Sequence, residues 1–176
     1  MQHKPLDQQV IVITGASSGI GLCTALLAAE RGATVVLLAR SAQTLHTIVQ
    51  AITEDGGKAQ AIVCDVADRE QLFLAADEVR LTYGRIDTWV NNAGVAIYGR
   101  LEEVPDADSR RLFDVNFWGT VNGSLAALPA LADRFAARQA SRQERAAPPR
   151  DPEGTLVRPG ESGRVYGVDE DGDVLA

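Results

Sequence analysis

The chain has 176 residues, 45% of them hydrophobic and 23% charged, which is the composition of one globular domain with a hydrophobic core. Its formal net charge of −7 argues against nucleic-acid binding, because proteins that hold phosphate backbones present a basic face. No segment reaches the roughly 20 apolar residues that cross a bilayer, and no signal-peptide pattern is present, so we expect a cytoplasmic protein that does not contact membranes.

Short apolar runs alternate with longer amphipathic segments over residues 8 to 94, which is the pattern of β-α-β units. The four expected strands are residues 10–13, 35–38, 59–64 and 86–90. Ser41 and Asp68 are the expected N-caps of the second and third helices. The pattern predicts an α/β protein with a Rossmann-type, doubly wound parallel sheet in the strand order 3-2-1-4.

Residues 106–138 predict one or two further helices, with a kink at Pro129. The apolar residues available for their buried face are Leu112, Val115, Phe117, Val121, Leu125 and Leu128. Beyond residue 138 the apolar periodicity ends, and proline-rich and acidic runs follow. We therefore expect a folded domain over residues 1–138 and a disordered or loosely packed tail over residues 139–176.

A glycine-rich turn joins the first expected strand to the first expected helix. Its residues are Gly15, Ala16, Ser17, Ser18, Gly19, Ile20 and Gly21. A strand, a tight turn and a helix N-terminus together form a binding site for the pyrophosphate of a dinucleotide. Gly15 allows the turn, Gly19 lets the pyrophosphate approach and Gly21 lets the helix pack closely on the sheet. Residues 1–138 are thus predicted to bind a dinucleotide, with a merely tight loop as the alternative.

Arg40 follows the second expected strand, where an NAD-binding domain places an acidic residue that accepts a hydrogen bond from the ribose 2′-hydroxyl. Arginine has only donors, and its fork of N–H groups suits a 2′-phosphate. The hydroxyls of Ser17 and Ser18 offer further donors. We therefore expect NADP in preference to NAD, and the alternative is that Arg40 is a solvated surface charge.

Five ordered landmarks over about residues 6 to 130 resemble those of the short-chain dehydrogenase/reductase (SDR) family. They are the glycine turn, Ala39-Arg40, Asp65-Val66, Asn91-Asn92-Ala93-Gly94 and Val115-Asn116 with Gly119. The resemblance implies an NADP-dependent oxidoreductase that acts on the CH–OH or carbonyl group of a small molecule. It also implies that Asp65, beside Val66, contacts the adenine, that Asn92, Ala93 and Gly94 line the cofactor cleft, and that Asn116 belongs to the catalytic tetrad.

The sequence departs from this family at its proton relay, which needs a Tyr and a Lys four residues apart on one helix. The family's intervals counted from Asn116 reach Ser141, Gly154 and Arg158, so neither residue is present there. The lysines are Lys4 and Lys58 alone, and no tyrosine has a lysine four positions later. The fold is therefore expected to be incomplete relative to the full family fold.

Two hypotheses follow from these residues. The first is an SDR-type oxidoreductase whose catalysis is impaired in this chain, and the second is a non-catalytic nucleotide-binding module or an inactive truncated product. Apolar surface left open by the missing part would favour a homo-oligomer. Cys23 and Cys64 lack metal-ligand spacing, so we expect no metal site and two buried free thiols.

Overall fold

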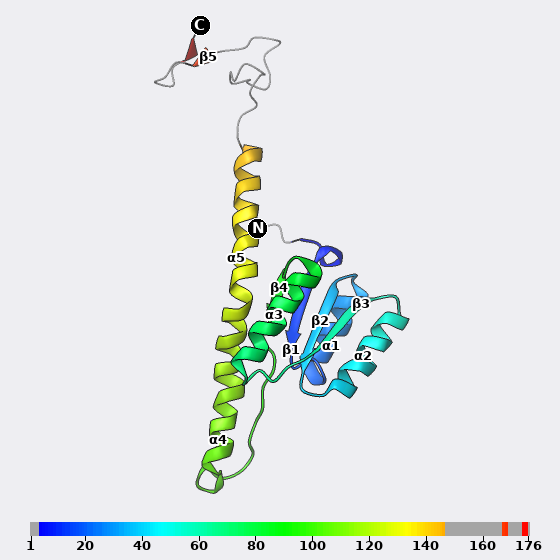
Figure 1. The fold of residues 1–176 in the computed structure, drawn as a ribbon, viewed down its shortest axis with the longest axis vertical. Coiled ribbons are helices and arrows are strands. Elements are labelled where there is room, and N and C mark those ends of the chain that lie inside the picture. The colour runs from blue at the N-terminus through cyan, green and yellow to red at the C-terminus, as the bar shows by residue number, and fades with distance from the viewer. Residues whose placement is uncertain (1–3, 147–166, 169–173, 176) are drawn as a thin grey trace. The chain divides into compact units, whose positions relative to one another are not determined.

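The computed structural model describes residues 4–146, 167–168 and 174–175. It divides into two compact units, Met1–Arg134 and Phe135–Ala176, and the first contains the main sheet (Figure 1). The strands and longer helices are, in chain order, β1 (Val10–Thr14), α1 (Gly19–Glu30), β2 (Thr34–Ala39), α2 (Ala42–Glu54), β3 (Lys58–Val63), α3 (Arg69–Tyr83), β4 (Thr88–Val90), α4 (Asp106–Phe113) and α5 (Gly119–Ala146). In the second unit, β5 (Gly167–Val168) and β6 (Val174–Leu175) pair antiparallel.

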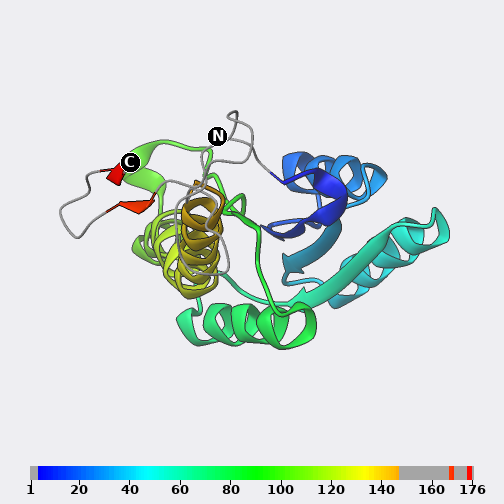
Figure 2. The ribbon, with the colours of Figure 1, turned by 90° about the horizontal axis from the view of Figure 1, so that it is seen from above.

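The main sheet has the order β3-β2-β1-β4, and all three pairings are parallel. The strand order predicted from the sequence is confirmed. Every residue of β1 is buried, as is typical of a strand whose two faces are both covered by helices. Figure 2 shows α1 and α3 on opposite sides of the strands, which is the doubly wound arrangement.

Alternate residues of the central strand supply two separate hydrophobic cores. Val10 and Val12 pack in the core that includes residues of α3 and α5, while Ile11 and Ile13 pack in the core formed with α1 and α2. This division follows from the two-residue period of a strand, which sends successive side chains to opposite faces. Both cores therefore hold β1 in place from its two sides.

The helix starts show how the sequence sets the element boundaries. Ser41 Oγ accepts from the Thr44 N–H at 3.3 Å, and Asp68 Oδ1 accepts from the Gln71 N–H at 3.2 Å. Both predicted N-caps are confirmed. The end of α3 is set by Gly84, whose φ of 69° is a left-handed conformation that other residues rarely adopt.

The buried face predicted for residues 106–138 is wrong at three of its six positions. Val115 is buried and Leu112 and Val121 are half-buried, whereas Phe117, Leu125 and Leu128 are 52%, 41% and 57% exposed. The first part of α5 instead packs through small and polar residues, which are Asn122, Ala126, Ala127 and Ala130. Small side chains let the helix approach the sheet, and this places the large apolar residues outside. The helix α5 also continues through Pro129. That the chain forms a homo-oligomer stays a prediction.

The tail predicted for residues 139–176 is described only in part. The helix α5 extends to Ala146, while residues 147–166, 169–173 and 176 lie outside the described residues. In the described part of the chain, no helix has the length and apolar character needed to cross a membrane. The two cysteines differ, because Cys64 is buried but Cys23 on α1 is exposed, which corrects the expectation of two buried thiols.

Candidate functional site

A cleft of about 340 Å³ lies at the carboxyl ends of the strands, where the glycine turn meets the segments that follow β2, β3 and β4. Of the predicted site residues, it brings together Gly15, Ser17, Ser18, Ile20, Arg40, Asp65, Val66, Asn92, Ala93 and Gly94. The wall is completed by Ala39, Cys64, Val95, Arg111 and Val115. The predicted residues that do not line it are Gly19, Gly21 and Asn116. The carboxyl edge of a parallel sheet is where open α/β folds bind ligands.

Two positions of the turn require glycine because another segment of the chain lies too close for a side chain. Gly15 has a φ of 65°, and a Cβ there would lie 2.7 Å from the Cα of Ala93. At Gly21 a Cβ would overlap the side-chain amide of Asn92 and lie 2.5 Å from the carbonyl oxygen of Gly15. Glycine at both positions therefore lets the turn, the start of α1 and the loop after β4 meet at one point.

A hydroxyl that the sequence analysis did not single out holds this meeting point together. Thr14 is 2% exposed, and its Oγ1 accepts from the N–H groups of Asn92 and Ala93, both at 3.0 Å, and donates to the Val90 carbonyl. The Asn92 side chain returns the contact by donating to the carbonyls of Thr14 and Gly15. This network ties the end of β1 to the end of β4 and holds in place Asn92 and Ala93, which line the cleft.

The N-terminus of α1 faces the cleft without a side-chain cap. Ser18 occupies the N-cap position, but its hydroxyl accepts no capping hydrogen bond, in contrast to Ser41 and Asp68 at the next two helices. The first amide groups of a helix have no partner within the helix, and its dipole favours an anion there. This end of α1 therefore keeps donors available to a ligand.

Arg40 lies at the end of β2 with its side chain exposed, and it lines the same cleft as Ser17 and Ser18. Within residues 4–146 it forms no hydrogen bond and no ion pair. Its guanidinium therefore adds positive charge to the cleft without being neutralised by a fixed partner.

Asp65 and Arg111 form an ion pair across the cleft wall. Arg111 on α4 donates from one guanidinium nitrogen to both carboxylate oxygens of Asp65, at 2.7 and 3.0 Å. Burial acts to raise the pKa of Asp65, but the Ala67 N–H, the Arg111 guanidinium and the charge of Arg40 outweigh it and hold this pKa below its ordinary value. Asp65 is therefore a carboxylate at neutral pH. Arg111 escaped the sequence analysis because nothing in its local pattern distinguishes it.

Asn116 lies beside the cleft in the π turn η3 (Asp114–Trp118). Its side-chain amide donates to the Val95 carbonyl and its Oδ1 accepts from the Val95 N–H, both at 2.8 Å. Both ends of the amide are thus engaged with one backbone segment. Cys64, on the cleft wall, stays a neutral thiol because burial and the nearby Asp65 and Asp68 carboxylates raise its pKa to about 11.

The positions expected for the proton relay are not assembled in the described residues. Gly154 and Arg158 lie outside the described part of the chain, and Ser141 lies on α5 without a described side chain. Tyr83 and Tyr98 do not line the cleft, and burial together with Glu78 raises the pKa of Tyr83 above its ordinary value.

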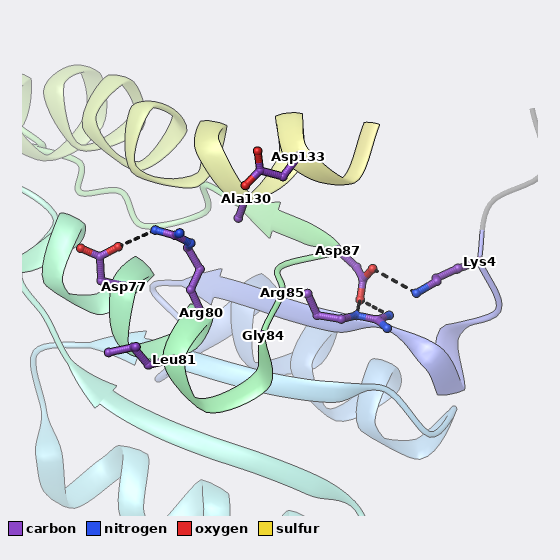
Figure 3. Close-up of a pocket in the computed structure, with 9 residues that line it drawn as sticks. All are labelled: Lys4, Asp77, Arg80, Leu81, Gly84, Arg85, Asp87, Ala130 and Asp133. Carbon is purple, nitrogen blue, oxygen red and sulfur yellow. Dashed lines mark hydrogen bonds and ion pairs between the residues drawn. The ribbon is translucent and has the colours of Figure 1, made fainter. Parts of the chain in front are cut away.

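A second cavity, of about 580 Å³, opens at the amino ends of the strands (Figure 3). Its charged lining includes Asp87, whose buried carboxylate accepts from the Val10 N–H at 2.8 Å and from Arg85, and which pairs with Lys4 at 3.8 Å. Arg85 in turn donates to the carbonyl of Gln8. These charges are used within the protein, and the network joins the start of β4 to the start of β1. We therefore infer that the charged residues of this cavity stabilise the fold.

Comparison with known proteins agrees with these landmarks. A family profile described as short chain dehydrogenase matches residues 9–139. An uncharacterized oxidoreductase of Bacillus subtilis (strain 168), YxnA, is 48% identical over 128 residues, which are 73% of this chain and 36% of that protein.

Two solved structures extend the comparison to the fold. A metagenomic short-chain oxidoreductase in complex with NADP is 36% identical, with a TM-score of 0.67 over 70% of this chain and 56% of its own. L-Sorbose reductase from Gluconobacter frateurii, complexed with NADPH and L-sorbose, is 32% identical, with a TM-score of 0.68 over 72% and 48%. The chain thus spans between 36% and 56% of the length of these three relatives. On the profile match and this likeness, the chain belongs to the short chain dehydrogenase family.

Proposed function

We propose that this chain binds NADP in the cleft at the carboxyl ends of the strands, and that it is the cofactor-binding part of an oxidoreductase acting on CH–OH or carbonyl groups. In this proposal residues 1–138 are the dinucleotide-binding domain. The observation that carries it is Arg40, which lines the cleft beside Ser17 and Ser18 without an ion-pair partner among residues 4–146. A guanidinium so placed suits a 2′-phosphate and cannot accept from a 2′-hydroxyl.

Three features of the cleft fit a dinucleotide. The uncapped start of α1 presents amide donors to a pyrophosphate, and glycine at positions 15 and 21 lets the turn, the start of α1 and the loop after β4 meet beside those donors. Asp65 is ionised and lies where the family contacts the adenine ring. The bound nicotinamide ring would supply or accept the hydride of the reaction. Relatives solved with NADP and with NADPH support the choice of cofactor.

The second part of the proposal concerns catalysis. The 176 residues contain no tyrosine with a lysine four positions later, so the chain as printed lacks the positioned proton donor that contributes about 10²–10⁴ to the rate of such reactions. Asn116 cannot replace it, because an amide has no proton to give at neutral pH and both ends of this one hold Val95. This absence favours a cofactor-binding module without turnover as the second candidate function.

The test is a fluorescence titration of the chain with NADPH and, separately, with NADH. We expect NADPH to bind more tightly by about 1.5–3 kcal/mol, which is the range of a charge-assisted hydrogen bond. The variant Arg40→Ala should lose this difference, while Arg31→Ala, an exposed arginine at the other end of α1, should keep it. Equal affinities for the two cofactors, or a preference kept by Arg40→Ala, would remove Arg40 from this role.

A second measurement separates binding from turnover. The chain is incubated with NADPH and a panel of ketones and aldehydes, and the absorbance of NADPH is followed. We expect binding without substrate-dependent oxidation. Clear oxidation that depends on substrate would contradict the catalytic part of the proposal and leave the binding part intact.

A further inference from the structure

Three charged side chains meet on one wall of the cleft, and each comes from a different element. Arg40 follows β2, Asp65 follows β3, and Arg111 lies on α4. Arg111 contacts both oxygens of Asp65 within 3.0 Å. Arg40 is close enough for its charge to lower the pKa of Asp65, yet it forms no hydrogen bond with it. The carboxylate therefore has two cationic neighbours and is bonded to one of them.

This arrangement matters because Asp65 and a 2′-phosphate compete for the same charge. A phosphate monoester carries a charge of about −1.5 to −2 at neutral pH, so an uncompensated carboxylate nearby would repel it. The same carboxylate would also be an available partner for the Arg40 guanidinium, which would then be occupied. Asp65 would thus weaken 2′-phosphate binding unless another cation compensates its charge.

We propose that Arg111 is a positioning residue for cofactor selection: its ion pair with Asp65 compensates that carboxylate and leaves Arg40 available to the 2′-phosphate. The inference rests on the proposed binding of NADP. It gives α4 a function in the cleft, since the helix brings in a residue 46 positions along the chain from Asp65. Arg111 donates to both oxygens of the Asp65 carboxylate, and the Ala67 N–H donates to Oδ1. The negative charge of Asp65 is therefore compensated by these donors.

A purely structural role, in which the ion pair only ties α4 to the end of β3, predicts a different outcome. Loss of such a tie would weaken every ligand of the adenosine subsite to a similar degree. Loss of the proposed role would weaken only those ligands that carry a 2′-phosphate, and the effect would depend on the charge of Asp65.

The experiment uses 2′,5′-ADP and 5′-AMP as probes, because they are the adenosine halves of NADP and NAD. Their dissociation constants are measured by isothermal titration calorimetry on the full chain. The readout is the ratio of the 5′-AMP constant to the 2′,5′-ADP constant, which cancels effects common to both ligands. We expect Arg111→Met to lower this ratio about tenfold at low salt, and to lower it less at high salt.

Two further variants tie the effect to Asp65. The double variant Arg111→Met with Asp65→Asn should recover the ratio of the unmodified chain, because the uncompensated charge is gone. The matched control Arg110→Met removes an exposed arginine that precedes Arg111 on the same helix and does not line the cleft. It should leave the ratio unchanged.

The outcomes separate the two proposals. If the unmodified chain binds both probes equally, the proposed NADP preference fails, and this role of Arg111 fails with it. If the unmodified chain prefers 2′,5′-ADP and Arg111→Met keeps that preference, Arg111 alone is excluded. A lowered ratio that Asp65→Asn does not restore also overturns the inference. Should Arg111→Met fail to fold, Asp65→Asn alone decides, because the proposal requires it to keep or raise the ratio.

Discussion

The two ends of the parallel sheet differ in how they use their polar groups. At the amino ends, the buried Asp87 carboxylate accepts from the Val10 N–H and pairs with Arg85 and Lys4, so the charges are used inside the protein. At the carboxyl ends, Ser18 leaves α1 uncapped and Arg40 has no ion pair among residues 4–146. The comparison teaches that one fold can place a stabilising charge network and a cleft with available charge and donors at opposite ends of the same strands.

The largest expected effect is at the amino ends of the strands, in the Asp87 network. We expect Asp87→Ala to lower the free energy of unfolding by about 1.5–3 kcal/mol, because it leaves the buried Val10 N–H without its acceptor and the partly exposed Arg85 without its ion-pair partner. Urea denaturation measures this change. The control Asp77→Ala removes an exposed pair with Arg80 and should cost less than about 1 kcal/mol. Similar losses for the two variants would contradict a structural role for the Asp87 network.

The hydrogen bonds of Thr14 are the next test, because at the carboxyl ends of the strands they bear both on stability and on the position of the cleft residues Asn92 and Ala93. Thr14→Val keeps the shape of the side chain but leaves the N–H groups of Asn92 and Ala93 without their acceptor. We expect a loss of about 1–3 kcal/mol in stability and weaker NADPH binding. Thr47→Val, at an exposed position on α2, should change stability by less than about 0.5 kcal/mol. Unchanged NADPH binding in Thr14→Val would show that the hydrogen bonds of Thr14 do not shape the site.

The N-cap residues of α1 and α2 allow a direct comparison, with smaller expected changes in stability. Ser41→Ala removes a hydrogen-bonded cap from α2 and should cost about 1 kcal/mol of stability. Ser18→Ala removes a hydroxyl that caps nothing, so it should leave stability unchanged and weaken NADPH binding instead. Thermal unfolding and NADPH titration of both variants test this. A stability loss in Ser18→Ala as large as that in Ser41→Ala would mean that α1 is capped after all.

The smallest effect is a pH dependence. The pKa of Asp65 is lower in the folded chain than its ordinary value of 3.8, so the ionised carboxylate stabilises the fold above that value. This contribution is lost as the pH falls below about 4 towards the folded-state pKa. We expect Asp65→Asn to flatten the fall in unfolding free energy over this acidic range. An unchanged slope would show that the Ala67 N–H, Arg111 and Arg40 together do not favour the charged form.

Much of the fold could be predicted because its signals are local. The apolar runs of β1 and β2, the caps Ser41 and Asp68, and the glycine turn each depend on residues close together in the sequence. The parallel order then follows from the alternation of strands and helices. Most of the predicted cofactor residues lie together for the same reason, since they follow the strands whose carboxyl ends share one edge.

What escaped prediction depends on contacts between distant segments. Arg111 is recognisable only once α4 lies against the end of β3, and Thr14 looks like one more strand residue until Asn92 and Ala93 reach its hydroxyl. The face of α5 was wrong because the prediction followed its large apolar residues. The helix packs instead through alanines and Asn122, whose small size allows a close approach that no hydrophobic count reveals.

The bonds around Thr14 also have a consequence for synthesis on the ribosome. The hydroxyl of Thr14 and the N–H of Asn92 are 78 residues apart in the chain, and β1 pairs with β4 over a similar separation. The glycine turn is therefore synthesised early, but its neighbour Thr14 cannot form its hydrogen bonds with Asn92 and Ala93 until the loop after β4 has left the ribosome. Because closing so long a loop slows folding, the cleft should be among the last parts of the nascent domain to become ordered.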